Sequence, residues 1–118
     1  MAAHFVTNQA KKLLDSFNAR IAQTDAKGKI TTWEKVISNG ITYYTHKSTE
    51  WKNEAFFRPE IKSAKLTFNI VKPSNKNVSV TAYGYYHGHL TETFLNHFDD
   101  MFSVAHATAK AETGDEIQ

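Results

Sequence analysis

Residues 30–48 read ITTWEKVISNGITYYTHKS and hold the strongest local structural signal in the chain. Asn39-Gly40 lies between two runs that are rich in β-branched and aromatic residues. Both central residues of a type I′ turn need positive φ, which Asn and Gly tolerate best. The sequence therefore predicts a tight hairpin of residues 30–38 and 41–48. In this register Val36 lies opposite Tyr43, and Trp33 lies opposite His46.

Two further strands are predicted at residues 61–72 and 78–86, separated by the turn-forming residues 73–77. Apolar and polar side chains alternate in both runs, which is typical of strands with one buried face. A register that keeps apolar side chains together places Phe68 opposite Val80. The opposite face of this second hairpin then carries Lys65, Thr67, Tyr83 and Tyr85.

Amphipathic helices are predicted at residues 8–24 and 91–111, because apolar side chains recur there at steps of three and four. Thr7 or Asn8 is the expected N-cap of the first helix, and Thr91 that of the second. Residues 49–60 fit neither the helical nor the strand period, and Arg58-Pro59 disfavours a continuous helix. We therefore expect an irregular connection there.

These elements predict an α+β fold with the order α-β-β-β-β-α. The simplest architecture is a two-layer sandwich, in which a four-stranded antiparallel sheet carries both helices on one face. Residues 1–111 form the single expected domain, and residues 112–118 are expected to be a flexible acidic tail. The side chains expected to be mutually buried are Phe17, Leu66, Phe68, Val80, Phe98 and Phe102.

The composition restricts the class of protein. A chain of 118 residues with 13% aromatic residues is long enough for one domain with an aromatic core. It contains no cysteine, so disulfides and thiolate chemistry are excluded. No apolar run reaches the roughly 18–20 residues that span a bilayer, and the first residues lack the pattern of a signal peptide. We expect a cytoplasmic protein with no membrane partner and no cofactor.

The charge is unevenly distributed along the chain. Residues 1–76 contain 13 of the 14 Lys and Arg but only half of the 12 Asp and Glu. Residues 77–118 contain one lysine and the other half of the acids. One explanation is that the two parts neutralise each other after folding. The alternative is a nucleic-acid-binding domain that uses the basic residues 1–76.

The uncovered sheet face is the first candidate binding site. No element of the predicted fold covers Tyr83, Tyr85, Lys65 and Thr67. Tyrosine and a neighbouring cation suit a protein interface, and they also suit stacking with single-stranded bases. The leading hypothesis is a non-catalytic interaction domain that forms a homodimer through this aromatic face. A second protein or a small molecule is the alternative partner.

A second candidate site surrounds His87 and His89. Two histidines separated by one residue on extended backbone point the same way, which suits a metal ion, although no further ligand is spaced to complete the set. These histidines and Glu34 also suggest the rival hypothesis, a small enzyme or ligand-binding protein with a pocket between sheet and helices. No nucleophile motif accompanies them, so we favour a domain without catalytic activity.

Overall fold

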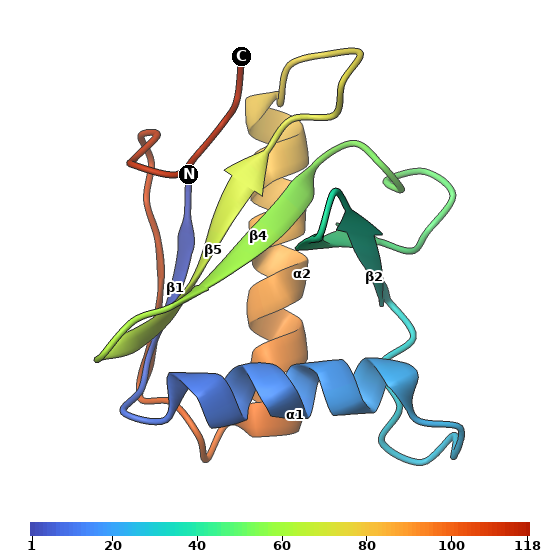
Figure 1. Ribbon diagram of the computed structural model, residues 1–118, viewed down its shortest axis with the longest axis vertical. Helices are drawn as coiled ribbons and strands as arrows, with labels where there is room; N and C mark the ends of the chain where they lie inside the picture. The colour runs from blue at the N-terminus through green and yellow to red at the C-terminus, as the bar shows by residue number, and fades with distance from the viewer.

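The computed structural model describes residues 1–118 and combines two helices with one six-stranded antiparallel sheet. Figure 1 shows the strands of residues 56–61 and 65–71 in front of the long second helix, with the first helix lying across the lower end of that helix. The sheet order is β2-β3-β4-β5-β1-β6. The elements are β1 Ala3–Val6, α1 Ala10–Ala22, β2 Trp33–Ser38, β3 Ile41–His46, β4 Phe56–Ile61, β5 Lys65–Val71, α2 Val80–Phe98 and β6 Val104–Ala107.

The α+β class is confirmed, and so is the first hairpin. Strands β2 and β3 pair in the predicted register, with Val36 opposite Tyr43. Asn39 and Gly40 both adopt positive φ, as a type I′ turn requires. Helix α1 falls inside its predicted range, although Thr7 accepts a hydrogen bond from the Gln9 amide and Gln9 occupies the N-cap position.

The strand predicted at residues 78–86 is wrong, because this segment forms the first half of α2. Ser79 caps the helix by accepting a hydrogen bond from the Ala82 amide at 3.0 Å. Val80, expected in the core, begins the helix and is 74% exposed. The segment is rich in Ser, Thr, Val and Tyr, which favour strands locally. Packing of the helical stripe on the sheet overrides that preference: its buried residues are Ala82, Tyr83, Tyr86, Leu90, Thr93, Phe94 and Phe98.

The helix predicted at residues 91–111 is also misplaced, since α2 ends at Phe98 and residues 104–107 form strand β6. Strand β6 pairs with β1, which in turn pairs with β5. Neither β1 nor β6 was predicted. Each has only four residues, and an alternation that short is masked by the neighbouring helical periodicity.

The connection predicted at residues 49–60 is irregular only as far as Ala55, because β4 begins at Phe56. Strand β4 includes Pro59, which has no amide hydrogen to donate. Pairing between β3 and β4 is limited to Tyr44 and Phe57, so Pro59 lies where β4 has a neighbour on one side only. The sheet therefore contains six strands instead of four, and β5 pairs with β4 and β1 instead of residues 78–86.

Both helices pack against Phe68 of β5, as the sequence predicts. The Phe68 ring lies 6.0 Å from Phe17 of α1 and 5.6 Å from Phe94 of α2, centroid to centroid. Leu66 and Phe98 are also buried, and Phe102 is half-buried against Phe5. Neither helix is both long and apolar enough to cross a membrane.

Residues 112–118, which we call the strap, make hydrogen bonds with the sheet. The Glu116 amide donates to the Ile70 carbonyl at 2.9 Å, and Arg58 donates to the Glu116 carboxylate at 2.8 Å. In Figure 1 the C-terminal segment runs back past the end of β5. The flexibility expected for this segment stays a prediction for measurement in solution.

Candidate functional site

The four residues expected on one open sheet face do not share a face. Lys65 and Thr67 belong to β5, whereas Tyr83 and Tyr85 belong to α2. Thr67 is fully buried and its hydroxyl lies 2.8 Å from Nδ1 of His4. An aromatic open sheet face built from these residues is therefore absent.

Tyr83 holds α2 to the edge of the sheet. Its hydroxyl donates to the Thr108 carbonyl at 2.9 Å, and only 8% of the residue is exposed. Burial, together with the nearby carboxylates of Asp115 and Glu112, raises the pKa of Tyr83 to about 12. The phenol is thus a neutral hydrogen-bond donor at physiological pH.

Tyr85 belongs to a stack of three rings at the N-terminal half of α2. Its ring lies 4.2 Å from Trp51 and 4.1 Å from His89, with interplanar angles of 15° and 21°. All three side chains are half-buried. The stack fixes the irregular loop before β4 against α2, so these rings already have aromatic partners within the chain.

The extended backbone expected at His87 and His89 is wrong, because both residues belong to helix α2. On helix α2 the two rings diverge: Nε2 of His87 lies 3.0 Å from the His106 carbonyl, and Nδ1 of His89 lies 3.3 Å from Nε2 of His46. Nowhere do three or more His, Asp or Glu side chains gather in a way that suits a metal ion.

Buried His46 and half-buried His89 form a pair that sequence reasoning missed. The Ser48 amide donates to Nδ1 of His46 at 3.1 Å, so Nε2 of His46 carries the proton and donates to Nδ1 of His89. Burial, followed by the proximity of His89, lowers the pKa of His46. The two residues are 43 positions apart, and no local pattern could have shown that they meet.

The His4 imidazole lies between a hydroxyl and a carboxylate, an arrangement that resembles the hydroxyl, imidazole and carboxylate of a catalytic triad. Its Nδ1 is hydrogen-bonded to Thr67, and its Nε2 to Glu112. A nucleophile has to reach a substrate, however, and the Thr67 side chain is completely enclosed. The lowered pKa of His4, caused mainly by burial, is therefore a feature of sheet packing.

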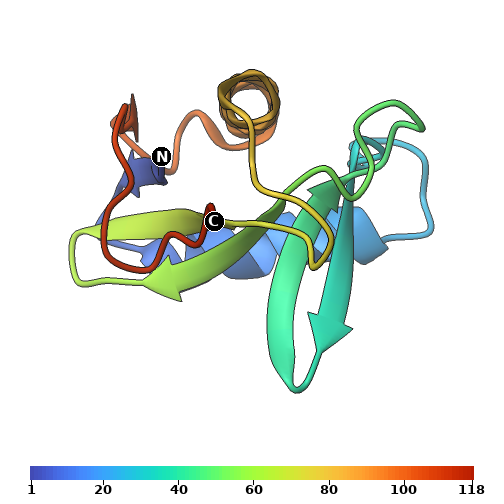
Figure 2. The same ribbon diagram turned by 90° about the horizontal axis from the view of Figure 1, so that it is seen from above.

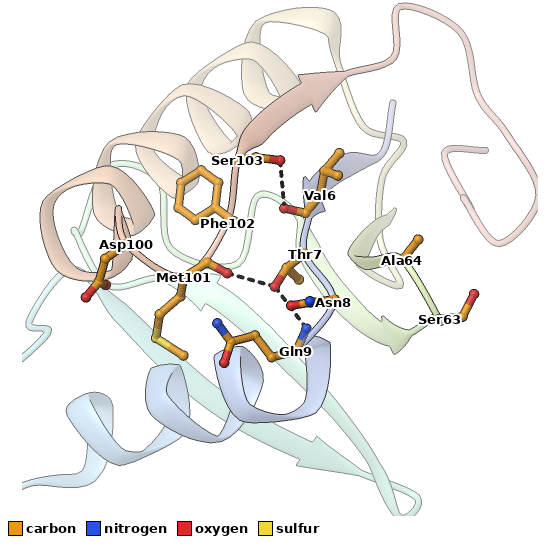
Figure 3. Close-up of a pocket in the computed structure, with 10 residues that line it drawn as sticks. All are labelled: Val6, Thr7, Asn8, Gln9, Ser63, Ala64, Asp100, Met101, Phe102 and Ser103. Atoms are coloured by element: carbon orange, nitrogen blue, oxygen red, sulfur yellow. Dashed lines mark hydrogen bonds between the residues drawn. The ribbon is translucent and has the colours of Figure 1, made fainter.

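One hollow, shown in Figure 3, lies where the β1–α1 and α2–β6 connections meet. Its volume is about 500 Å³. Two of its polar residues are hydrogen-bonded within the chain: Thr7 donates to the Met101 carbonyl at 2.7 Å, and the Ser103 amide donates to the Val6 carbonyl at 2.9 Å. Asp100 is exposed at the rim, and no second acid or base lies beside it in the lining.

A more apolar groove lies beside the first hairpin and has a volume of about 280 Å³. The rings of Tyr43 and Phe56 meet there at 6.1 Å and 72°. Glu34, considered above as a pocket acid, is in an ion pair with Lys52 at 3.2 Å. We call this surface the hairpin groove and define it by its apolar lining: Val36, Tyr43, Phe56, Val71 and Pro73.

Comparison of the chain with protein-family models, curated proteins and solved structures found no match.

Proposed function

We propose that this protein is a non-catalytic interaction domain that forms a homodimer through the hairpin groove. The observation that carries the proposal is the cluster of half-buried aromatic and aliphatic side chains in that groove. Ile41 extends the same surface, because it follows the alternation of Tyr43 along β3, and it is 43% exposed. Contiguous apolar surface of this kind is typical of a protein contact.

A second copy of the chain is the partner we favour, because a two-fold contact needs only a patch that fits its own copy. Two lysines near the groove are matched by acids, since Lys52 pairs with Glu34 and Lys76 pairs with Glu54. Lys72 of the groove lining is in no ion pair, so an acidic group of the partner copy could meet it there. The hairpin projects from the rest of the sheet, as Figure 2 shows, which makes it accessible to such a contact.

The test is sedimentation at micromolar concentration with two matched variants. Tyr43→Lys places a charge in the hairpin groove and should shift a dimer toward the monomer mass of 13.4 kDa. Ile37→Lys is the control, because Ile37 lies on the opposite face of the same hairpin and is 65% exposed. The control should leave the dimer intact.

A wild-type mass that stays at 13.4 kDa at all concentrations would end the homodimer proposal. Two alternatives from the sequence then take its place. Salt-dependent retention on single-stranded nucleic acid would favour binding by residues 1–76. Saturable binding of a small molecule that perturbs the resonances of His87 and His89 would favour the ligand-binding alternative.

A further inference from the structure

The strap is attached to the sheet as a short added strand. Residue Glu116 bridges Val71 of β5 in parallel orientation, at the part of β5 that β1 does not reach. The Lys72 amide donates to the Glu116 carbonyl at 2.6 Å, and the Val78 amide donates to the Ile117 carbonyl at 3.1 Å. These backbone contacts are those by which sheets bind extended peptides.

Each carboxylate of the strap has a partner on the sheet. Asp115 accepts from the Asn69 side chain at 2.9 Å and from the Ile70 amide at 3.2 Å, and its side chain is completely buried. Glu116 pairs with Arg58 at 2.8 Å, and Glu112 is hydrogen-bonded to His4. The partners lie on three different strands, so the fold itself builds the binding surface for these acids.

Gly114 adds a steric requirement. Its φ is +100°, and a Cβ at this position would lie 2.7 Å from Oδ1 of Asn69. Its carbonyl also accepts a hydrogen bond from Arg58. Any side chain here would strain the backbone and push Asn69 away, so the surface accepts only glycine directly before the buried acid.

We propose that the open end of β5, with Arg58 and Asn69, is a binding site for an extended acidic peptide of another protein, and that the strap occupies this site in the free chain. The peptide would carry glycine followed by two acidic residues. Backbone pairing supplies affinity, while the guanidinium and the buried amide select carboxylates. Because the strap is tethered, its effective concentration is in the millimolar range, so the intact chain binds a free peptide only weakly.

The experiment measures fluorescence anisotropy of a labelled peptide that copies residues 111–118. A chain that ends at Ala111 should bind it saturably at one peptide per chain, and the peptide should raise the melting temperature of that chain. The intact chain should show at least about tenfold weaker binding, because the tethered strap competes. Circular dichroism establishes that the shortened chain is folded.

Matched peptides identify the contacts. A peptide with Gly114→Ala should bind at least about tenfold more weakly, because the added Cβ clashes with Asn69. A peptide with Asp115→Asn should lose at least about as much, because a buried hydrogen-bonding group is left unsatisfied. Glu116→Gln should have a smaller effect because its ion pair is exposed. If the altered peptides bind as well as the original, the proposed selectivity is wrong.

A second variant keeps the test decisive if the shortened chain does not fold. The full-length chain with Gly114→Ala retains Ile117 and every core residue but cannot seat its own strap. It should bind the unaltered peptide, whereas the wild-type chain should not do so at the same concentration. Absence of binding to a folded Gly114→Ala chain would show that the strap is a fixed structural segment, and the proposal would be abandoned.

Discussion

On one face of the sheet, Phe5 and Phe68 pack ring against ring with Phe94 of α2. On the other face, His4, Thr67 and Asn69 are polar and connect to one another or to the strap. The aromatic face excludes water over a large apolar area, and its stability is insensitive to charge. The polar face depends on hydrogen bonds, ion pairs and protonation. The same strands therefore present one face that resists changes in solvent and one that responds to them.

Truncation of the aromatic face should have the largest effect. Phe94 contacts the rings of Phe5, Phe17 and Phe68 at 4.2–5.6 Å and is fully buried. Phe94→Ala should lower the free energy of unfolding by about 3–5 kcal/mol, measured by denaturant titration. The adjacent Leu95 is 51% exposed, and Leu95→Ala should change stability by only about 0.5 kcal/mol. Equal losses for the two variants would contradict the placement of α2 on the sheet.

Acid should have the next effect. Burial lowers the pKa values of His4, His46, His87 and His97 below their ordinary value. The unfolded chain then binds more protons than the folded chain at pH values just below 6.5. Stability is therefore fully present above pH 6.5 and is lost as the pH falls toward the folded-state pKa values.

Melting temperatures measured between pH 8 and pH 5 test this direction of the pH dependence. The range includes the pKa of an unperturbed histidine, which is about 6.5. His46→Phe should flatten the pH dependence, because it removes one buried imidazole. His106→Gln, at an exposed position, is the matched control and should leave the curve unchanged. If stability instead rises on acidification, the pKa values of these histidines are raised in the folded protein and the expected direction is wrong.

Removal of one exposed ion pair of the strap should have the smallest effect. The Glu116 side chain is 58% exposed, and its pairing with Arg58 is screened by salt. Glu116→Gln should reduce the free energy of unfolding by about 0.2–1 kcal/mol at low salt, and the difference should disappear in about 1 M salt. Asp15→Asn removes the still more exposed pair with Lys11 and should cost no more. A large, salt-independent loss at Glu116 would mean that its backbone pairing had failed as well.

The sequence predicted those parts of the fold whose causes are local. Asn39-Gly40 determines its hairpin by turn geometry alone, and the stripe of α1 is complete within one segment. The helical state of residues 80–86 depends on contacts with strands that lie far away in the chain. Tyr86, for example, lies between Trp33 and Phe57. Local preference for a strand was therefore outweighed by tertiary packing.

The candidate surfaces were predicted less well than the fold. The hairpin groove combines residues of four strands and a turn, and the strap partners Asn69 and His4 lie 46 and 108 positions away from the acids that they bind. An acidic terminal segment looks solvated by composition, because nothing in its own sequence reveals Arg58 or Asn69 as partners. Tyr83 and Tyr85 were expected on one surface because strand alternation was assumed. On a helix, by contrast, two residues that are two positions apart point in different directions.

The position of β1 between β5 and β6 affects how the chain acquires its structure during synthesis. Ala3 pairs with Phe68 on one side and with Ala107 on the other, so β1 has no strand partner until residues 65–68 of β5 have been synthesised. Contacts that close such long loops form late and slow the folding reaction. Until then the Phe5 side chain lacks the Phe68 ring against which it packs in the folded protein, and its apolar surface is open to unwanted contacts.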